Sequence, residues 1–146
     1  MWYHFCVRIV LDTDAIVAAM RSPTGASASI IRKARRGKIA LLLSVPLAME
    51  YEAVCVRPEH QLAAGLSEQE VHIFVDAVIA IAEPVKIHYL WRPQLRDPSD
   101  EMVLEAAVNG RANLLITFNV RDYGTAPARF GIEVMTPREA VERISK

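Results

Sequence analysis

Acidic residues follow the ends of apolar segments in this 146-residue chain, and they are the side chains best suited to chemistry. Asp12 comes directly after the apolar run Phe5–Leu11. A second apolar run, Leu114–Phe118, leads into Asn119 and Asp122. Ligands of open α/β folds bind at the carboxyl ends of the strands. If both runs are strands, these polar side chains face a common ligand at that edge.

Further acids lie between these two segments. Glu50 lies in a helical stretch at the edge of an apolar stripe, where an acid is costly unless it is paired or bound to a metal. Asp97 and Asp100 lie at the start of another helix, and Asp100 is the better ligand because apolar residues follow it at helical spacing. Hard divalent cations prefer carboxylate oxygens. Acids from four distant segments therefore predict a carboxylate pocket for such an ion.

Each acid also has a purely structural explanation. An Asp at a strand-to-helix junction can cap the helix; Asp14 fits this cap better, which leaves Asp12 free to point into the cleft. Glu50 taken alone suits a surface or salt-bridged position. The acids near Asp100 complement the dipole of their helix, and Asp122 suits another helix cap. The prediction therefore depends on the joint arrangement of the acids and not on any one of them.

Apolar runs alternate with amphipathic segments along the chain. The runs predicted as strands are 5–11, 39–44, 85–90, 113–118 and 132–135. Helices are predicted over about 14–20, 27–36, 46–56, 67–82, 97–110 and 136–145, with Ser67 and Thr136 as caps. Strands that alternate with helices favour a mainly parallel sheet covered on both faces. We therefore expect a single α/β domain over residues 1–146, a compact three-layer sandwich around about five strands.

Apolar stripes predict how two of these helices face the core. The stripe of the 46–56 helix consists of Leu47, Tyr51 and Val54. The stripe of the 67–82 helix consists of Ile73, Ala77, Val78 and Ile81. Both assignments rest on the helical period alone.

Composition limits the function classes. The 17 basic and 17 acidic residues cancel, so any contact with nucleic acid must come from a local patch and not from a global field. No apolar run approaches the roughly 20 residues of a membrane span, and we expect a soluble, cytoplasmic protein with no membrane partner. Cys6 and Cys55 are expected as buried free thiols. None of the four histidines clusters with a second His or Cys, so we expect them to be bystanders.

Five segments, in order along the chain, resemble the motifs of the PIN domain family, in particular the toxin components of toxin–antitoxin systems (VapC-like ribonucleases). The segments are 10–14, 43–58, 96–107, 115–123 and 134–139. Asp14 departs from the family pattern, which usually has Asn there. Asn119 is a second departure, because many relatives carry Asp at that position.

The resemblance implies a metal-dependent endoribonuclease whose catalytic acids are Asp12, Glu50, Asp100 and Asp122. It implies Mg²⁺ or Mn²⁺ on Asp12 and Asp100, where the ion would lower the pKa of a water that attacks the phosphodiester. The supporting residues would be Asp14, Asp97, Thr117 and Asn119. Crowded carboxylates repel one another, so raised pKa values are expected in the empty site.

The resemblance also implies partners: an RNA substrate, a cognate antitoxin protein and a second copy of the chain. Met20, Tyr51 and Trp91 are candidates for the protein-binding surface. RNA phosphates have two sets of candidate ligands. The first set, Arg32, Lys33, Arg35, Arg36 and Lys38, spreads around one helix. The second set, Arg92, Arg96 and Arg121, lies near the acids in sequence.

Two other functions remain open from the sequence. A degenerate PIN fold that binds RNA or a partner without cutting is suggested by Asp14 and Asn119. A phosphatase of the haloacid dehalogenase type is suggested by Asp12-Thr13-Asp14, with Asp12 as nucleophile. Against the phosphatase, Ile16 stands where a Thr or Val is expected, and the downstream lysine motif is missing.

Overall fold

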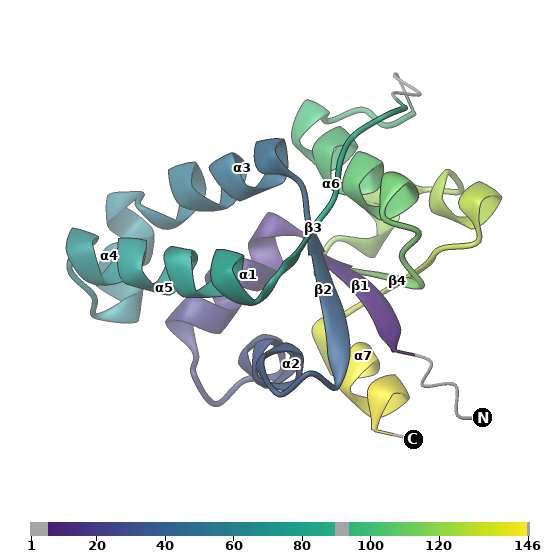
Figure 1. The fold of residues 1–146 in the computed structure, drawn as a ribbon. Coiled ribbons are helices and arrows are strands. Elements are labelled where there is room, and N and C mark those ends of the chain that lie inside the picture. Colours follow the sequence, from purple (N-terminus) through teal and green to yellow (C-terminus); the bar gives the residue numbers. More distant parts are fainter. Residues whose placement is uncertain (1–5, 90–93, 146) are drawn as a thin grey trace.

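The sheet of this protein is entirely parallel, as the alternation of strands and helices predicted. In the computed structural model, which describes residues 6–89 and 94–145, five strands form one sheet in the order β3-β2-β1-β4-β5 (Figure 1). The strands are β1 (Val7–Leu11), β2 (Ile39–Leu43), β3 (Glu83–Pro84), β4 (Leu114–Ile116) and β5 (Glu133–Met135). The α/β fold class is therefore confirmed.

Helices cover both faces of the sheet. They are α1 (Thr13–Arg21), α2 (Ala26–Arg35), α3 (Val45–Cys55), α4 (Pro58–Ala64), α5 (Glu68–Ile81), α6 (Pro98–Asn109) and α7 (Pro137–Ile144), with two 3₁₀ turns, η1 (Val120–Tyr123) and η2 (Pro127–Phe130). Helix α6 packs on β1 and β4, whereas α2 and α7 pack together on the opposite side (Figure 1). Among the described residues, no helix is both long enough and apolar enough to span a bilayer.

The register between β1 and β4 brings the polar strand ends together. Leu11 pairs with Ile116, and the Asp12 amide continues the ladder by donating to the Ile116 carbonyl at 2.9 Å. The β1 core residues Ile9, Val10 and Leu11 are fully buried, as expected for a central parallel strand covered on both faces. Asp12 and Thr117 are thus neighbours at the carboxyl edge of the sheet.

The third strand lies earlier than predicted. The sequence favoured residues 85–90, but only Glu83 and Pro84 pair with β2, and one further hydrogen bond joins the Val85 amide to the Leu43 carbonyl. Pro84 lacks an N–H, which is tolerated at a sheet edge. Leu90 lies outside the described residues, as does Phe5 at the start of the first predicted strand.

Two helical details were also wrong. Helix α5 buries Val71, Val75 and Val78, whereas Ile73 is 61% exposed. The helix is apolar on almost every side, so the period could not define the buried face, and packing against α3 selects it. Helix α4 was not predicted, because Arg57 and Pro58 were interpreted as a stop; Pro58 instead occupies the first helical position, where its missing N–H costs nothing.

Several side chains differ from expectation in their burial. Cys6 is exposed, although Cys55 is a buried free thiol as expected. Met20 and Tyr51, expected as candidate surfaces, are buried at 4% and 0% exposure. In α3 it is Cys55, and not the half-buried Val54, that completes the buried stripe.

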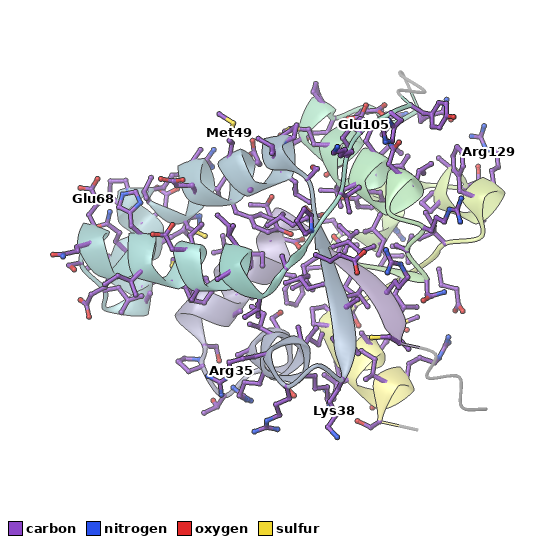
Figure 2. All side chains as sticks on the ribbon, in the orientation of Figure 1. Arg35, Lys38, Met49, Glu68, Glu105 and Arg129 are labelled. Atoms are coloured by element: carbon purple, nitrogen blue, oxygen red, sulfur yellow. The ribbon has the colours of Figure 1, made fainter. Side chains whose placement is uncertain are left out.

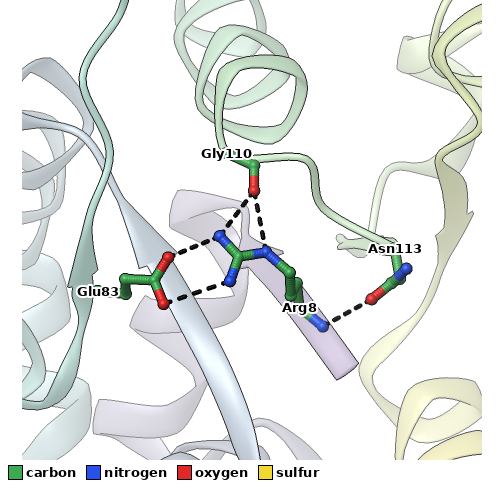
Figure 3. Close-up of polar contacts among 4 residues, drawn as sticks. All are labelled: Arg8, Glu83, Gly110 and Asn113. Carbon is green, nitrogen blue, oxygen red and sulfur yellow. Dashed lines mark hydrogen bonds and ion pairs between the residues drawn. The ribbon is translucent and has the colours of Figure 1, made fainter. Parts of the chain in front are cut away.

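The amino-terminal edge of the sheet is fastened by Arg8 (Figure 3). Its guanidinium donates to both carboxylate oxygens of Glu83, at 3.3 and 2.6 Å, and twice to the Gly110 carbonyl, at 3.1 and 2.9 Å. Its amide donates to Asn113 Oδ1 at 2.8 Å. One side chain on β1 therefore connects β3 to the end of α6.

Gly110 ends α6 where no larger residue fits. A Cβ at this position would lie 2.9 Å from both Leu42 Cδ1 and Val85 Cγ2, and 2.8 Å from the Ala106 carbonyl oxygen. Real Cβ atoms do not approach other atoms so closely, so the glycine allows α6 to end directly against the sheet.

The Arg8 network predicts a measurable loss of stability. We expect Arg8→Met to lower the free energy of unfolding by about 1–3 kcal/mol, because it removes charge-assisted bonds to two elements while keeping the aliphatic stem. Arg143→Met removes an exposed ion pair to Glu133 only and should leave stability nearly unchanged. Urea unfolding followed by circular dichroism measures both, and equal effects would contradict the role given to Arg8.

Candidate active site

Asp12 is the buried centre of the carboxyl edge. It is the N-cap of α1, with Oδ1 accepting from the Thr13 amide at 2.7 Å, and it is 7% exposed. Its other oxygen, Oδ2, accepts from the Thr117 hydroxyl at 2.8 Å and the Tyr123 hydroxyl at 2.9 Å. The sequence had given the cap to Asp14 and a free carboxylate to Asp12. That assignment was wrong: Asp12 caps α1, and the carboxylate of Asp14 is hydrogen-bonded to the residues that follow β4.

Asp14 lies in the first turn of α1 and reaches across to the segment after β4. Its Oδ2 accepts from the Phe118 amide at 3.1 Å, the Asn119 side-chain amide at 3.0 Å and the Thr117 hydroxyl at 3.3 Å. Its Oδ1 is buried without a hydrogen-bond partner among the described residues. Burial, and then the charge of Asp12, raise the pKa of Asp14 to about 6.

The two departures from the PIN pattern contact each other. Asp14 stands where Asn is usual and Asn119 where Asp is frequent, and Asn119 Nδ2 donates to Asp14 Oδ2 at 3.0 Å. The usual pair of one amide and one carboxylate is therefore present, but the carboxylate is at position 14 and the amide at position 119. The carboxylate count of the pair is the same as in the usual arrangement.

Asp100, on a different helix, lies close enough to Asp12 for the two charges to interact. It lies in the first turn of α6, and Asp97 caps this helix by accepting from the Ser99 amide at 2.9 Å. Burial raises the pKa of Asp100 to about 7, with further contributions from the charges of Asp12, Asp97 and Asp122. The carboxyl edge thus carries electrostatically coupled acids from α1 and α6.

Tyr123 separates Asp12 from Asp100. Its fully buried side chain places the hydroxyl 2.9 Å from Asp12 Oδ2 and 3.5 Å from Asp100 Oδ1. Burial, and then the neighbouring acids, raise the pKa of Tyr123 well above its ordinary value, so it remains a neutral donor. The sequence did not single out Tyr123; its place after Asp122, just beyond a buried strand, was the available signal.

Glu50 and Asp122 extend the acidic group at its two sides. Glu50 is half-buried on α3 and lines a cleft together with Asp12 and Asp14. The neighbouring Tyr51 is fully buried, and its hydroxyl donates to the Leu11 carbonyl, which ties α3 to the residue before Asp12. Asp122 is exposed on η1 and lines a different cleft with Asp100.

Two clefts open beside the acids. The first, of about 530 Å³, contains Asp97, Asp100 and Asp122 with three arginines, Arg96, Arg121 and Arg129. The second, of about 650 Å³, contains Asp12, Asp14 and Glu50. The predicted set of acids is therefore divided between two adjoining clefts.

Three arginines that line the first cleft have no structural partner among the described residues. Within residues 6–89 and 94–145, the guanidinium groups of Arg96, Arg121 and Arg129 form no hydrogen bond or ion pair. Arg129 was not predicted, and Arg92 lies outside the described residues. Figure 2 shows Arg129 far from Arg35 and Lys38, which lie at the other end of the molecule, toward the amino end of β2.

Two buried glutamates of α6 were missed by the sequence analysis. Glu101 and Glu105 are 4% and 7% exposed. Glu101 Oε1 accepts from the Gln94 and Leu95 amides, both at 2.6 Å, and so fixes the backbone that leads to Arg96. Their positions on an otherwise apolar face were the available signal.

The donor chemistry of the carboxyl edge fits a hard divalent cation. All candidate ligands are carboxylates, Asp14 Oδ1 is buried and unpartnered, and the coupled acids favour a positive charge. In their present positions, no three His, Cys, Asp or Glu side chains of the described residues converge as a complete ligand set. Hydroxyl groups lie between the acids instead: Thr117 bonds to Asp12 and Asp14, and Tyr123 lies between Asp12 and Asp100.

The raised pKa values predict how stability depends on pH. Asp14 and Asp100 hold their protons up to about pH 6 and 7 in the folded chain but have an ordinary pKa of 3.8. Between about pH 4 and 7 the folded state therefore binds more protons, and its free energy of unfolding falls as the pH rises. In EDTA, Asp100→Asn should stabilise the chain by on the order of 1 kcal/mol at pH 8 and by progressively less toward pH 4.

Thermal unfolding at a series of pH values measures this difference. Asp76→Asn, which removes an exposed acid of α5, is the matched control and should show no such trend. A pH-independent effect of Asp100→Asn would contradict the electrostatic coupling of the acids.

Comparison with known proteins supports the resemblance seen in the motifs. A family model described as PIN domain matches residues 8–121, a segment that includes Asp12, Glu50, Asp100 and Asn119 and ends just before Asp122. The search of curated proteins found no match. PIN domains are generally nucleases and typically use divalent metals. The match spans most of the chain and favours the PIN assignment over a phosphatase of the haloacid dehalogenase type. The protein belongs to the PIN domain family and has its nuclease-type fold.

Proposed function

We propose that this protein is a metal-dependent endoribonuclease, with residues 1–146 acting as one PIN-like domain. The observation that carries the proposal is that the charge of buried Asp12 raises the pKa of both Asp14 and Asp100 at the carboxyl edge of a PIN fold, where Thr117 is bonded to Asp12 and Asp14 and Tyr123 to Asp12 and Asp100. The buried core continues past the matched segment through Ile132 and Met135, which supports a single unit.

Asp12 and Asp100 are the proposed ligands of Mg²⁺ or Mn²⁺. Such an ion would supply an activated water and neutralise charge developing on the phosphate. Glu50 and Asp122 flank the two ligands and are proposed to complete the catalytic acids. Four residues support this group, each by a contact already described or by its charge: Asp14, Asp97, Thr117 and Asn119.

The first cleft is the proposed path of the RNA backbone. Arg96, Arg121 and Arg129 line it beside Asp100, and their guanidinium groups are available for phosphate oxygens. Arg92 remains a candidate by its position in the sequence. Arg32 is a weaker candidate, because it donates to the Pro23 carbonyl at 2.7 Å within its own region of the fold.

A role as the toxin of a toxin–antitoxin pair is proposed from the family resemblance. Exposed apolar side chains offer a surface for a cognate antitoxin or for a homodimer: Val45 and Met49 on α3, Leu62 on α4 and Ile73 on α5 are 61–86% exposed. Figure 2 shows Met49 pointing outward from α3. The free cysteines agree with a cytoplasmic location, where thiols stay reduced.

A PIN fold that binds RNA without cutting is the second candidate. One observation favours it: no three potential ligands among the described side chains converge on one point. The exchange of Asp14 and Asn119 argues against it, because the two changes compensate each other in charge and hydrogen bonding. A cleavage assay separates the two functions.

We expect the wild type to cut a mixed pool of single-stranded and structured RNA in Mn²⁺ or Mg²⁺ and not in EDTA. Asp12→Asn and Asp100→Asn should each lower cleavage by at least about 100-fold, since each removes a proposed ligand. Asp76→Asn is the control and should cut normally. If folded wild type saturated with metal does not cut RNA, the RNA-binding function is favoured instead.

The antitoxin proposal makes a separate prediction. Co-expression with the protein encoded by the neighbouring reading frame should give a stable complex with reduced nuclease activity. Met49→Asp and Leu62→Asp, both at exposed apolar positions, should weaken this complex while cleavage by the free chain persists. Size-exclusion chromatography with light scattering measures the complex and the oligomeric state. If no complex forms, the antitoxin proposal is wrong, whereas the nuclease proposal is unaffected.

A further inference from the structure

The second cleft shows the same order of side chains on two walls. Along α1, Asp14 is followed one turn later by Val17 and Ala18, and after another turn by Arg21. Along α3 and the residues after it, Glu50 is followed by Val54 and then Arg57. On each wall an acidic residue comes first along the chain, small apolar side chains follow, and an arginine comes last.

Phe118 adds an aromatic surface to this cleft. It follows β4, is 52% exposed, and its amide is fixed by Asp14 at 3.1 Å. An exposed aromatic ring beside a carboxylate pocket contributes nothing to the core. Aromatic side chains at such positions stack on unpaired bases, and this contact tolerates any base.

The far end of the cleft is positively charged. Within the described part of the chain, Arg21 and Arg57 form no side-chain hydrogen bond or ion pair, in contrast to Arg8 and Arg143, which are bonded to glutamates. His60 of α4 also lines the cleft. A volume of about 650 Å³ lies within the roughly 300–1,000 Å³ of small-ligand sites.

We propose that this cleft binds one unpaired nucleotide of the RNA next to the bond that is cut. The base lies in the apolar middle against Phe118, and the phosphate beyond it contacts Arg21 and Arg57. This inference rests on the proposed nuclease function. It places RNA on both sides of the acids, because the arginines of the first cleft hold the strand on the other side. The substrate is therefore a single strand or a loop, since a paired base cannot stack on a side chain.

Binding can be measured apart from cleavage. The probe is a fluorescein-labelled 12-nucleotide oligouridine, compared with a 12-base-pair RNA duplex, in buffer with Ca²⁺ in place of Mg²⁺ and with RNA integrity checked on a gel. Phe118→Ala should weaken binding of the single strand by roughly 5- to 150-fold, the loss expected for one stacked base. Binding of the duplex should not change.

Arg57→Ala should weaken binding and reduce the slope of log affinity against log salt by about 0.7, the value for one phosphate contact in a single strand. Ile79→Ala and Arg138→Ala are matched controls at exposed sites elsewhere and should bind as wild type. Circular dichroism and thermal unfolding establish that each variant is folded.

The outcomes distinguish this proposal from the nuclease proposal. If wild type cuts RNA but Phe118→Ala and Arg57→Ala bind the single strand normally, the nucleotide site is wrong and the nuclease stands. If wild type never cuts but its binding depends on Phe118 and Arg57, the nucleotide site stands and the nuclease fails. Equal loss of single-strand and duplex binding in Phe118→Ala would also overturn the site, because stacking requires an unpaired base.

Discussion

The parallel pairing of β1 with β4 is the constraint on which the site depends. Leu11 lies opposite Ile116, so the two strands end level and the next residues, Asp12 and Thr117, become hydrogen-bonded neighbours. A slip of one residue would separate this pair and turn the apolar side chains of a central strand to the other face. Asp12 caps helix α1, and η1 follows β4, so Asp14 and Tyr123 also take their positions from this register.

Repulsion among the acids is offset by neutral donors. Hydroxyl groups of Thr117 and Tyr123 and the amides of Thr13 and Phe118 stabilise Asp12 and Asp14. Among the described residues, no Lys or Arg forms an ion pair with these acids. The negative charge that remains without an ion-pair partner would favour the binding of a cation, whereas the arginines lie farther out along the two clefts.

Local patterns predicted the parts of the fold that local physics decides. Continuous apolar runs identified the central strands, and acids at their ends identified the carboxyl edge. The exchanged roles of Asp12 and Asp14 were not predictable, because both can cap a helix and only the partners Thr117 and Tyr123, more than 100 residues away, select between them. The same holds for α5: its sequence is apolar around most of its circumference, and its contacts with α3 and α2 decide which side is buried.

The close packing of Gly110 at one end of α6 affects the position of Asp100 at the other end. The helix has 12 residues and is about 18 Å long, with Asp100 in its first turn and Gly110 at its other end. Because the glycine is in close contact with Leu42 and Val85, a single methyl group there would lift that end of a rigid rod and tilt the acid at the opposite end. The position of Asp100 therefore depends on a residue without a side chain at the opposite end of the same helix.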